Sequence, residues 1–264
     1  MSGDEQEMTA VGPETFEIVM LDGVARCTMR GPRMNALGAE LLGPLFEGLE
    51  GVIDDDDVRV IVLRGSDGNF TVGADLTTMG EKMDPVMLHD NMARMGRILL
   101  ALHDGPRPFI TEVDGWAVGG GLGMAIASDI TYATEKAQFF LSFPRVAIMP
   151  DFGTSYFLTE RVGLAKAKEL ALTAARIDAE EALRIGLVNR VIDSGSISEE
   201  VMKVAAKLAS RSAKVLAETK RSINRAQRIG LEAELDLEAS LQPFFVLAPE
   251  HKQAVEEFFE KRKK

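Results

Sequence analysis

This chain of 264 residues is poor in the residues that form disulfides and hold metals. It has one cysteine and three histidines, and it lacks a His-Glu-x-x-His motif. A lone cysteine cannot form an internal disulfide, and Cys27 lies in an apolar, strand-like segment, which predicts a buried thiol without a chemical role. Because the histidines are scattered, we expect no metal site.

Basic residues and long apolar runs are also scarce. The 41 acidic residues outnumber the 30 basic ones, and a net charge of −11 disfavours a general binder of nucleic acid or anionic membranes. No apolar run is long enough to span a bilayer. The polar stretch 1–14 lacks the apolar core of a signal peptide. We therefore expect a cytoplasmic protein with no nucleic-acid and no membrane partner.

A glycine run, Gly119-Gly120-Gly121-Leu122-Gly123, lies between a strand-like segment at 108–113 and a helix-like one at 124–128. It does not fit a dinucleotide fingerprint, because the last glycine of that pattern falls on Met124 or Ile126. A P-loop and a Gly-x-Ser-x-Gly elbow are absent too. Bare N–H groups at a helix start suit an anion, or an oxygen that becomes negative during a reaction.

Strand-like and helix-like segments alternate along the first three quarters of the chain. An Asp22-Gly23 hairpin is followed by a predicted helix over 38–53 and a strand over 58–63. The pattern continues with a helix over 85–102, strands over 109–113 and 130–133, and a helix over 122–128. This alternation predicts an α/β core with largely parallel strands. Beyond Ser198 the pattern is helical throughout, with helices predicted over 201–210, 213–229, 231–246 and 250–262.

Five motifs stand in an order typical of one known superfamily. They lie at 69–76 (NFTVGADL), 114–121 (DGWAVGGG), 128–129 (SD), 150–156 (PDFGTSY) and 179–188 (AEEALRIGLV). Together they resemble the enoyl-CoA hydratase/isomerase, or crotonase, superfamily over roughly residues 16–262. That resemblance implies an α/β spiral of β-β-α repeats with a C-terminal helical region, assembled as a homotrimer or a dimer of trimers.

The resemblance also divides the chain and names its substrate. It implies a disordered N-terminus over 1–15, a spiral core over 16–197 and a helical trimerisation region over 198–264. The implied substrate is an acyl-CoA thioester whose carbonyl becomes an enolate-like oxyanion. No separate cofactor is expected, since coenzyme A is part of the substrate.

By motif position, the backbone N–H groups of Ala74 and Gly120 are the implied oxyanion donors. Hydratases of the superfamily carry two glutamates for acid/base work, and those positions are Gly123 and Phe143 here. Neither residue ionises. The resemblance therefore favours another reaction of the superfamily over ordinary hydration.

Asp151 matches the acidic base of Δ3,Δ2-enoyl-CoA isomerases, in which one carboxylate moves one proton. A helix N-cap is the competing interpretation of Asp151, because Gly153, Thr154 and an apolar run follow it. Three further alternatives stay open. The first is a 4-chlorobenzoyl-CoA dehalogenase-like reaction, or another hydrolytic or lyase reaction through Asp151, with His89 in the corresponding helix. The second is a dienoyl-CoA isomerase, which needs further acids at 123 and 143. The third is an inactive acyl-CoA-binding homologue.

The remaining predicted contacts concern the substrate. Arg33, Ala36 and Leu37 match the region that meets the CoA nucleotide. Lys261, next to Arg262, is a candidate for a CoA phosphate, or part of a solvated basic terminus. Four more residues are predicted to line the thioester site: Asp75, Leu76, Gly119 and Phe143. Five methionines suit either an acyl pocket or ordinary helix packing: Met79, Met83, Met87, Met92 and Met95. Glu112 has no explanation at this level.

Overall fold

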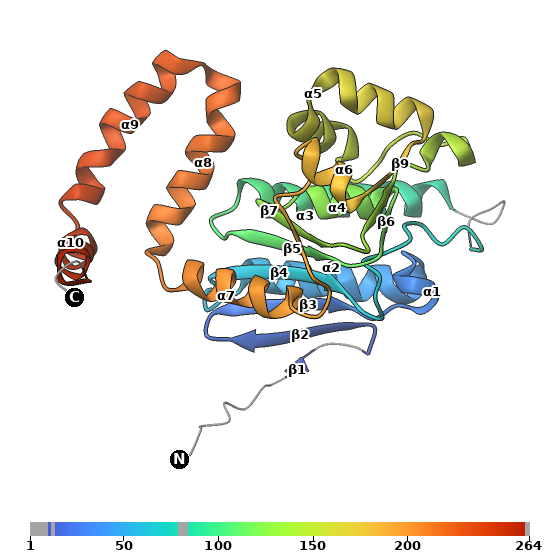
Figure 1. Cartoon of the computed structure of the whole chain (residues 1–264), viewed down its shortest axis with the longest axis horizontal. Helices are drawn as coiled ribbons and strands as arrows, with labels where there is room; N and C mark the ends of the chain where they lie inside the picture. Colours follow the sequence, from blue (N-terminus) through green and yellow to red (C-terminus); the bar gives the residue numbers. More distant parts are fainter. Residues whose placement is uncertain (1–9, 12–13, 79–83, 262–264) are drawn as a thin grey trace.

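Two β-sheets and the helices that wrap around them make up the protein (Figure 1). The computed structural model describes residues 10–11, 14–78 and 84–261. The main sheet has the order β1 (Ala10–Val11), β2 (Phe16–Leu21), β3 (Val24–Met29), β4 (Val60–Gly65), β5 (Phe109–Val113), β7 (Ile130–Thr134) and β10 (Arg190–Ile192). The small sheet has the order β6 (Trp116–Val118), β8 (Gln138–Phe140) and β9 (Arg176–Asp178).

Strands β3, β4, β5, β7 and β10 run parallel to one another, as the alternating pattern predicted. Strands β2 and β3 form the predicted hairpin. Asp22 and Gly23 both have positive φ values, 48° and 78°, which is the signature of a type I′ turn. Ala10 and Val11 lie inside the segment expected to be disordered, yet they pair with Val19 and Ile18 as strand β1.

The β-β-α repeat expected from the resemblance is present. It appears as β2-β3-α2 (Ala39–Asp54), β5-β6-α4 (Gly120–Ile126) and β7-β8-α5 (Thr154–Thr173). In the last two repeats the first strand joins the main sheet and the second joins the small sheet. Helix α4 starts directly after the chain leaves the small sheet, whereas the segment 141–153 separates β8 from α5. The other elements of this part are α1 (Pro32–Asn35), α3 (Pro85–Asp104), the 3₁₀ helix η1 (Phe143–Val146) and α6 (Ala179–Arg184).

Alternating side chains bury the two faces of the main sheet in two separate clusters. Cys27, Leu63 and Phe109 point toward the side covered by α2, α3 and α4. Val60 and Val62 point to the other side, which α7 (Ile197–Ala209) covers. The sequence analysis placed α7 in the C-terminal region, but its apolar face packs on the sheet. The helices that separate from the spiral therefore begin after α7.

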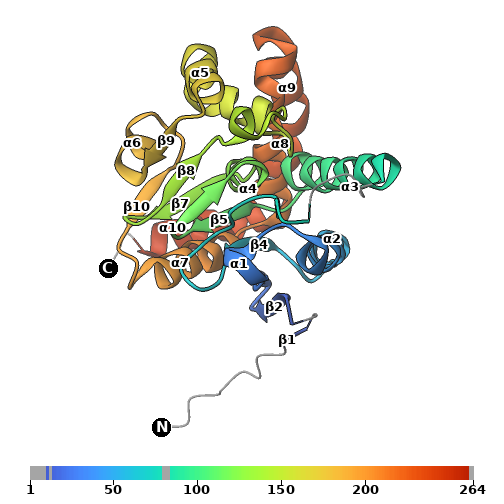
Figure 2. The ribbon, with the colours of Figure 1, turned by 90° about the vertical axis from the view of Figure 1, so that its right-hand side faces the viewer.

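The C-terminal arm consists of α8 (Ala213–Ile229), α9 (Leu231–Val246) and α10 (Pro249–Lys261), and it extends away from the spiral (Figure 1). Lys220 on α8 attaches it to the core. Its buried ammonium donates to the Leu102 and Arg107 carbonyls at 2.6 and 2.9 Å and to Asp129 Oδ2 at 2.8 Å. Figure 2 shows α8 behind the end of α3, where Asn224 Nδ2 donates to the His103 carbonyl. In the described residues, no helix is long and apolar enough to cross a membrane.

Candidate active site

The glycine run starts helix α4 at the junction of the two sheets. The structure begins the helix at Gly120, two residues earlier than predicted. Gly119, with φ 56° and ψ −127°, makes the sharp turn from β6, and its N–H donates to the Phe140 carbonyl at 2.9 Å. Since the first N–H groups of a helix have no partner within it, the N–H of Gly120 is free to bind a ligand at the positive end of the helix dipole.

A parallel pairing joins the segment that leads to Ala74 to the segment that leads to Gly120. Thr71 and Ala117 form a parallel bridge, in which the Thr71 N–H donates to the Trp116 carbonyl and the Val118 N–H donates to the Thr71 carbonyl. Ala74 and Gly120 each follow the bridge by three residues, and the Cβ position of Gly73, next to Ala74, lies close to Val118 and Gly119. Gly73 makes this approach possible. A Cβ there would meet the Val118 carbonyl oxygen at 2.6 Å.

We call residues 71–76 together with residues 33–37 the loop wall, because these two segments pair around Ala74. The Leu37 N–H donates to the Gly73 carbonyl at 2.8 Å, and Leu37 and Ala74 form a bridge. In the described part of the chain, the N–H of Ala74 itself donates to no backbone carbonyl. Both predicted donors of an oxyanion hole are therefore available.

A left-handed turn holds the loop wall in place. Arg33, Met34 and Asn35 have φ values of 52°, 58° and 58°, a conformation that L-residues avoid. The buried Asn35 amide compensates by donating to the carbonyls of Asn69, Ser66 and Phe70 at 2.9, 3.2 and 3.3 Å. This residue connects the turn to the loop that carries Ala74. Nothing in its local sequence marked Asn35, because its acceptors lie more than thirty residues away.

The predicted CoA contacts of the loop wall lie together. Arg33 Nη2 donates to Asp75 Oδ2 at 2.6 Å, and half of the Arg33 side chain is exposed. Hydrogen bonds from Thr77, and after them Arg33, hold the pKa of Asp75 below its usual value. Ala36 and Leu37 are buried. Leu76 is exposed, so its side chain is free to contact a ligand.

Asp151 lies directly against the start of helix α4. A Cβ placed on Gly120 would be 2.6 Å from Asp151 Oδ1, so the carboxylate borders the residue that carries the second donor. Asp151 does not cap α5 through its side chain. The N-cap of α5 is Gly153, no side chain caps it, and Asp151 Oδ1 is buried without a hydrogen-bond partner in the described structure. Burial raises the pKa of Asp151 to about 6.

Neither of the two positions that correspond to the hydratase glutamates carries an acid here: Gly123 has no space for a side chain, and position 143 is a buried phenylalanine. A Cβ on Gly123 would meet Thr154 Oγ1 at 2.2 Å and the Phe152 carbonyl oxygen at 2.8 Å, so helix α4 admits no side chain at that point. Phe143 is 2% exposed, and its ring lies 3.8 Å from a Cβ placed on Gly119. We call residues 119–123 with the 151–154 turn the helix wall. Within the helix wall, Asp151 is the residue that carries a carboxylate.

Some predicted residues are not brought to the site. Lys261 ends α10, which lies on the opposite side of the molecule from α1 in Figure 1, and its side chain and Arg262 lie outside the described residues. Met79 and Met83 also lie outside the described residues. Met95 is fully buried in the core and Met92 packs against it, which is ordinary helix packing, whereas Met87 is exposed.

Glu112 now has a structural explanation. It lies on β5 beside Arg64 of β4, and its Oε1 is 3.3 Å from Arg64 Nη1. The same oxygen accepts a 2.8 Å hydrogen bond from Ser198 Oγ on α7. Through Ser198, this partly buried ion pair attaches α7 to the sheet, on the face opposite the glycine helix. The partners follow from strand register, which a single strand segment does not reveal.

Comparison with known proteins settles the relationship. The family model described as "Enoyl-CoA hydratase/isomerase" matches residues 20–264. The chain belongs to this family. It is 31% identical over 242 residues to the short-chain-enoyl-CoA hydratase of Clostridium acetobutylicum, covering 91% of this chain and 92% of that protein. It is 27% identical to the trans-2-decenoyl-[acyl-carrier-protein] isomerase of Streptococcus mutans, covering 92% and 94%.

The fold agrees with solved structures of the enoyl-CoA hydratase/isomerase family. The structure of an enoyl-CoA hydratase/isomerase from Cupriavidus metallidurans superposes with a TM-score of 0.84 at 31% identity, covering 97% of this chain and 95% of that one. The predicted crotonase fold is confirmed. Most of the similar curated proteins are named hydratases. The family therefore identifies an acyl-CoA enzyme, and the reaction has to be argued from the residues at the site.

Proposed function

We infer that this protein is a Δ3,Δ2-enoyl-CoA isomerase, which moves a double bond from the 3 to the 2 position of an enoyl-CoA in fatty-acid metabolism. The observation that carries this inference is the position of Asp151 Oδ1, within 2.6 Å of the Cβ position of Gly120. To move one proton along an enolate, an enzyme needs one base, such as a carboxylate, and an oxyanion hole beside it that stabilises the enolate.

The reaction proceeds in two proton transfers. The Asp151 carboxylate removes a proton from C2 of the 3-enoyl thioester, and the electron pair moves into the thioester carbonyl. The N–H groups of Ala74 and Gly120 bind the resulting oxyanion of the dienolate, each donor contributing roughly 3 kcal/mol. The Asp151 carboxyl group then returns the proton to C4, which leaves the double bond between C2 and C3.

The pKa of Asp151 suits this role. At about 6 it leaves the carboxylate ionised at neutral pH, and it makes the carboxylate a stronger base than an exposed aspartate. Since only the ionised form accepts the substrate proton, kcat/KM should fall as the pH decreases through about 6.

The site supports hydration and dehalogenation less well. Hydration in this family uses glutamates at positions 123 and 143, and here Gly123 is closed off by Thr154 while Phe143 cannot ionise. A dehalogenase-like reaction needs a hydrogen-bond donor at position 143, which a phenylalanine ring lacks. His89, the candidate partner for that reaction, is largely exposed and lies 3.2 Å from Asp90.

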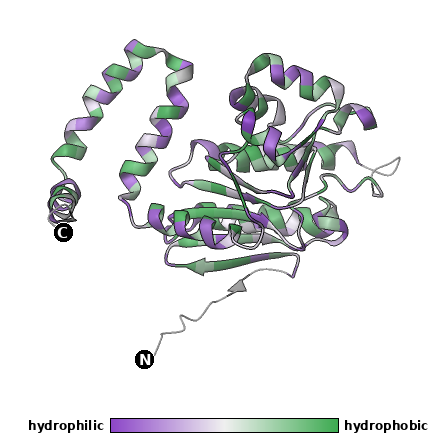
Figure 3. Cartoon of the chain, viewed as in Figure 1, coloured by the Kyte–Doolittle hydropathy of each residue, from purple (hydrophilic) through white to green (hydrophobic). Residues whose placement is uncertain are grey.

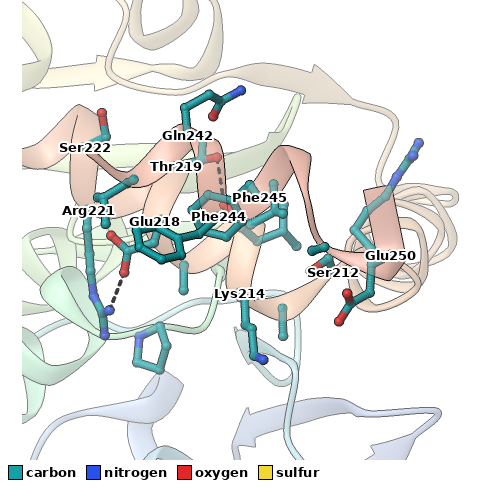
Figure 4. A pocket seen from close by; sticks show the side chains of 18 of the residues that line it. Ser212, Lys214, Glu218, Thr219, Arg221, Ser222, Gln242, Phe244, Phe245 and Glu250 are labelled. Atoms are coloured by element: carbon teal, nitrogen blue, oxygen red, sulfur yellow. Dashed lines mark hydrogen bonds and ion pairs between the residues drawn. The ribbon is translucent and has the colours of Figure 1, made fainter. Parts of the chain in front are cut away.

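Assembly as a homotrimer, or as a dimer of trimers, is part of the same proposal. The C-terminal arm leaves large apolar side chains exposed, with Phe244 76% and Leu247 84% accessible, and Figure 3 shows apolar stretches along α9. Its helices enclose a groove of about 1660 Å³ with Lys214, Glu218 and Phe245 in its lining (Figure 4). Apolar area of this kind typically marks a contact between chains. In such an assembly, Lys261 of one copy is the candidate for a CoA phosphate.

Turnover of a thioester panel in heavy water tests the proposed function. The panel contains 3-enoyl, 2-enoyl, dienoyl and aryl CoA thioesters, and mass spectrometry and NMR follow the products. We expect the 3-enoyl thioester to become the 2-enoyl isomer with deuterium at C2 or C4. Asp151→Asn should lose about 10²- to 10⁴-fold in rate, while the exposed control Asp90→Asn should keep the wild-type rate.

Each alternative gives a different result. Addition of water to the 2-enoyl thioester would identify a hydratase, and halide release from an aryl thioester would identify a dehalogenase. Tight binding of thioesters without turnover of any of them would identify an inactive homologue. An Asp151→Asn protein that isomerises at the wild-type rate would contradict the role of Asp151.

A further inference from the structure

The segment 151–154 is a strained turn. The Thr154 N–H donates to the Asp151 carbonyl at 2.9 Å, and the two residues between them, Phe152 and Gly153, have φ values of 47° and 70°. This is the geometry of a type I′ turn, which a phenylalanine adopts at a cost in free energy. Strained residues of this kind persist where the surroundings hold them, and they cluster at functional sites.

The turn brings its two end residues to one face of helix α4. Asp151 Oδ1 lies 2.6 Å from the Cβ position of Gly120, and Thr154 Oγ1 lies 2.2 Å from the Cβ position of Gly123. Residues three apart on a helix lie on the same side of it. The carboxylate and the hydroxyl therefore face the same strip of α4, one turn apart, in the space that glycines leave open.

Both oxygens are buried without a hydrogen-bond partner. In the described part of the chain only three buried side-chain atoms are in this position, and Asp151 Oδ1 and Thr154 Oγ1 are two of them. Thr154 is 1% exposed. Buried polar atoms rarely stay unpaired in folded proteins, and each exception requires an explanation. The two atoms are complementary, because an ionised carboxylate only accepts and a hydroxyl can donate.

We propose that Thr154 is a positioning residue for Asp151: its hydroxyl donates a hydrogen bond to one water, which in turn donates to the Asp151 carboxylate while that carboxylate is ionised. This inference rests on the proposed isomerase function. A carboxylate that carries a proton from C2 to C4 has to be held over both carbons, and a donor at the other end of the same turn supplies that constraint. When Asp151 takes up the proton, its neutral carboxyl group depends less on the hydrogen bond that the Thr154 hydroxyl supplies through the water.

Few other polar or titratable side chains lie where they could hold the Asp151 carboxylate by a hydrogen bond. Helix α4, from Gly120 to Ile126, has no titratable side chain. Arg145 of η1 lies over the Phe140 ring, and Tyr156 of α5 accepts a hydrogen bond from Arg228. Burial is the leading cause of the raised pKa of Asp151, a hydrogen bond from the backbone of Asp151 itself acts in the opposite direction, and no charged group contributes. Loss of the Thr154 hydroxyl should therefore appear directly in the titration of Asp151.

The experiment follows the Asp151 carboxyl carbon by ¹³C NMR over pH 4 to 9 in the full-length protein, and it measures isomerase kinetics in the same proteins. The variants are Thr154→Val, which keeps the shape and removes the hydroxyl, and Thr154→Ser, which keeps the hydroxyl. Thr159→Val is the matched control, because the Thr159 hydroxyl on the same helix donates to the Ser155 carbonyl. Asp151→Asn identifies the resonance, and thermal unfolding confirms that each variant folds.

Thr154→Val should raise the pKa of Asp151 by about one unit, as expected for a lost hydrogen bond to a charged group. It should also lower kcat about tenfold with KM within twofold, and Thr154→Ser should restore both values. The inference is overturned if folded Thr154→Val keeps the wild-type pKa and kcat, or if Thr154→Ser shows the same loss as Thr154→Val. A pKa shift in a protein without isomerase activity would support the water-mediated link between Thr154 and Asp151 and refute the proposed function.

Discussion

The two walls of the site present similar donors but are built in different ways. The α4 part of the helix wall is buried and made of glycine and apolar residues, and its proposed donor N–H comes from the free end of that helix. The loop wall has no regular structure around Ala74 and is held by polar side chains, among them Asn35 and the Arg33–Asp75 ion pair. The helix wall therefore has no room for added atoms on helix α4, whereas the loop wall has room at the exposed Ala74, though not at Gly73, and depends on its hydrogen bonds.

The strongest test of this difference is one non-hydrogen atom added to a side chain on each wall. Gly120→Ala would place a Cβ 2.6 Å from Asp151 Oδ1, which displaces the base from the donor. We expect kcat for 3-enoyl-CoA to fall by roughly 10² to 10³, the size of losing one oxyanion donor. Ala74→Ser changes only an exposed side chain on the loop wall, and kcat should stay within a fewfold of wild type.

A control for Gly120→Ala is available on helix α2. Gly51 has open space at its Cβ position, so Gly51→Ala should leave kcat unchanged and stabilise the fold by up to about 1 kcal/mol. If Gly120→Ala kept at least a tenth of the wild-type kcat, the contact between Asp151 and the helix wall would have no role in the reaction.

The second prediction removes a hydrogen-bonding group from the loop wall. Asn35→Ala leaves three carbonyl acceptors without their donor and keeps a side chain at φ 58°. We expect the free energy of unfolding in urea to drop by about 3 to 4 kcal/mol. Asn35→Gly loses the same hydrogen bonds without the backbone strain, so it should be milder by about 1 kcal/mol. Equal values for the two variants would mean that the left-handed backbone carries no cost.

The third prediction concerns the cost of burying Asp151 in the helix wall. Its pKa rises from 3.8 in the unfolded chain to about 6 in the folded protein. Between these two pKa values the folded state therefore binds more protons than the unfolded chain. Burial of Asp151 does not reduce the free energy of unfolding below about pH 4, and this free energy decreases as the pH rises to about 6. At pH 8, Asp151→Asn should be more stable than wild type by up to about 3 kcal/mol, although the proposed function predicts a loss of activity.

Urea unfolding at pH 8 and pH 4 checks this sign. The advantage of Asp151→Asn should vanish at pH 4, where the wild-type carboxyl is largely protonated in the folded state. If the difference in free energy of unfolding between Asp151→Asn and wild type were the same at pH 4 and pH 8, Asp151 would be solvated rather than buried against α4.

How far the sequence predicts the molecule depends on whether a feature is local. The Asp22-Gly23 turn, the apolar strands β4 and β5 and the helices α8 and α9 follow from neighbouring residues, and they lie at or within a few residues of their predicted positions. The glycine run likewise marked the helix wall. Helical periodicity predicted α7 within the C-terminal helical region, but it does not say what a helix packs against, and the packing of α7 on the main sheet is visible only in the structure.

The structure of the loop wall and of the Asp151–Thr154 turn could not be predicted from neighbouring residues. Asn35 acts on carbonyls at 66, 69 and 70, and Thr154 fills a space that depends on Gly123, thirty-one positions earlier. These relationships arise only when the two sheets bring distant segments together. Asp151 looked equally suited to capping a helix, and only the backbone of the turn shows that its side chain points to α4 instead.

The smallest expected effect is that of the exposed ion pair on the loop wall. Arg33→Ala should change the free energy of unfolding by less than about 1 kcal/mol, because the guanidinium is half exposed and screened by water and salt. If Arg33 also contacts the CoA nucleotide, KM for the thioester should rise a fewfold at low salt, and the rise should shrink at high ionic strength. Arg30→Ala removes a guanidinium of equal exposure from its pair with Glu17 and should leave KM unchanged.

Asp75→Asn completes this comparison, because it weakens the partner and leaves the guanidinium in place. An Arg33 freed from Asp75 is more available to a phosphate, so KM should stay constant or fall in Asp75→Asn while it rises in Arg33→Ala. Opposite directions would show that Arg33 serves the ligand. A rise in both would show that the ion pair serves the loop wall alone, by holding Ala74, whose N–H is a proposed oxyanion donor, in place.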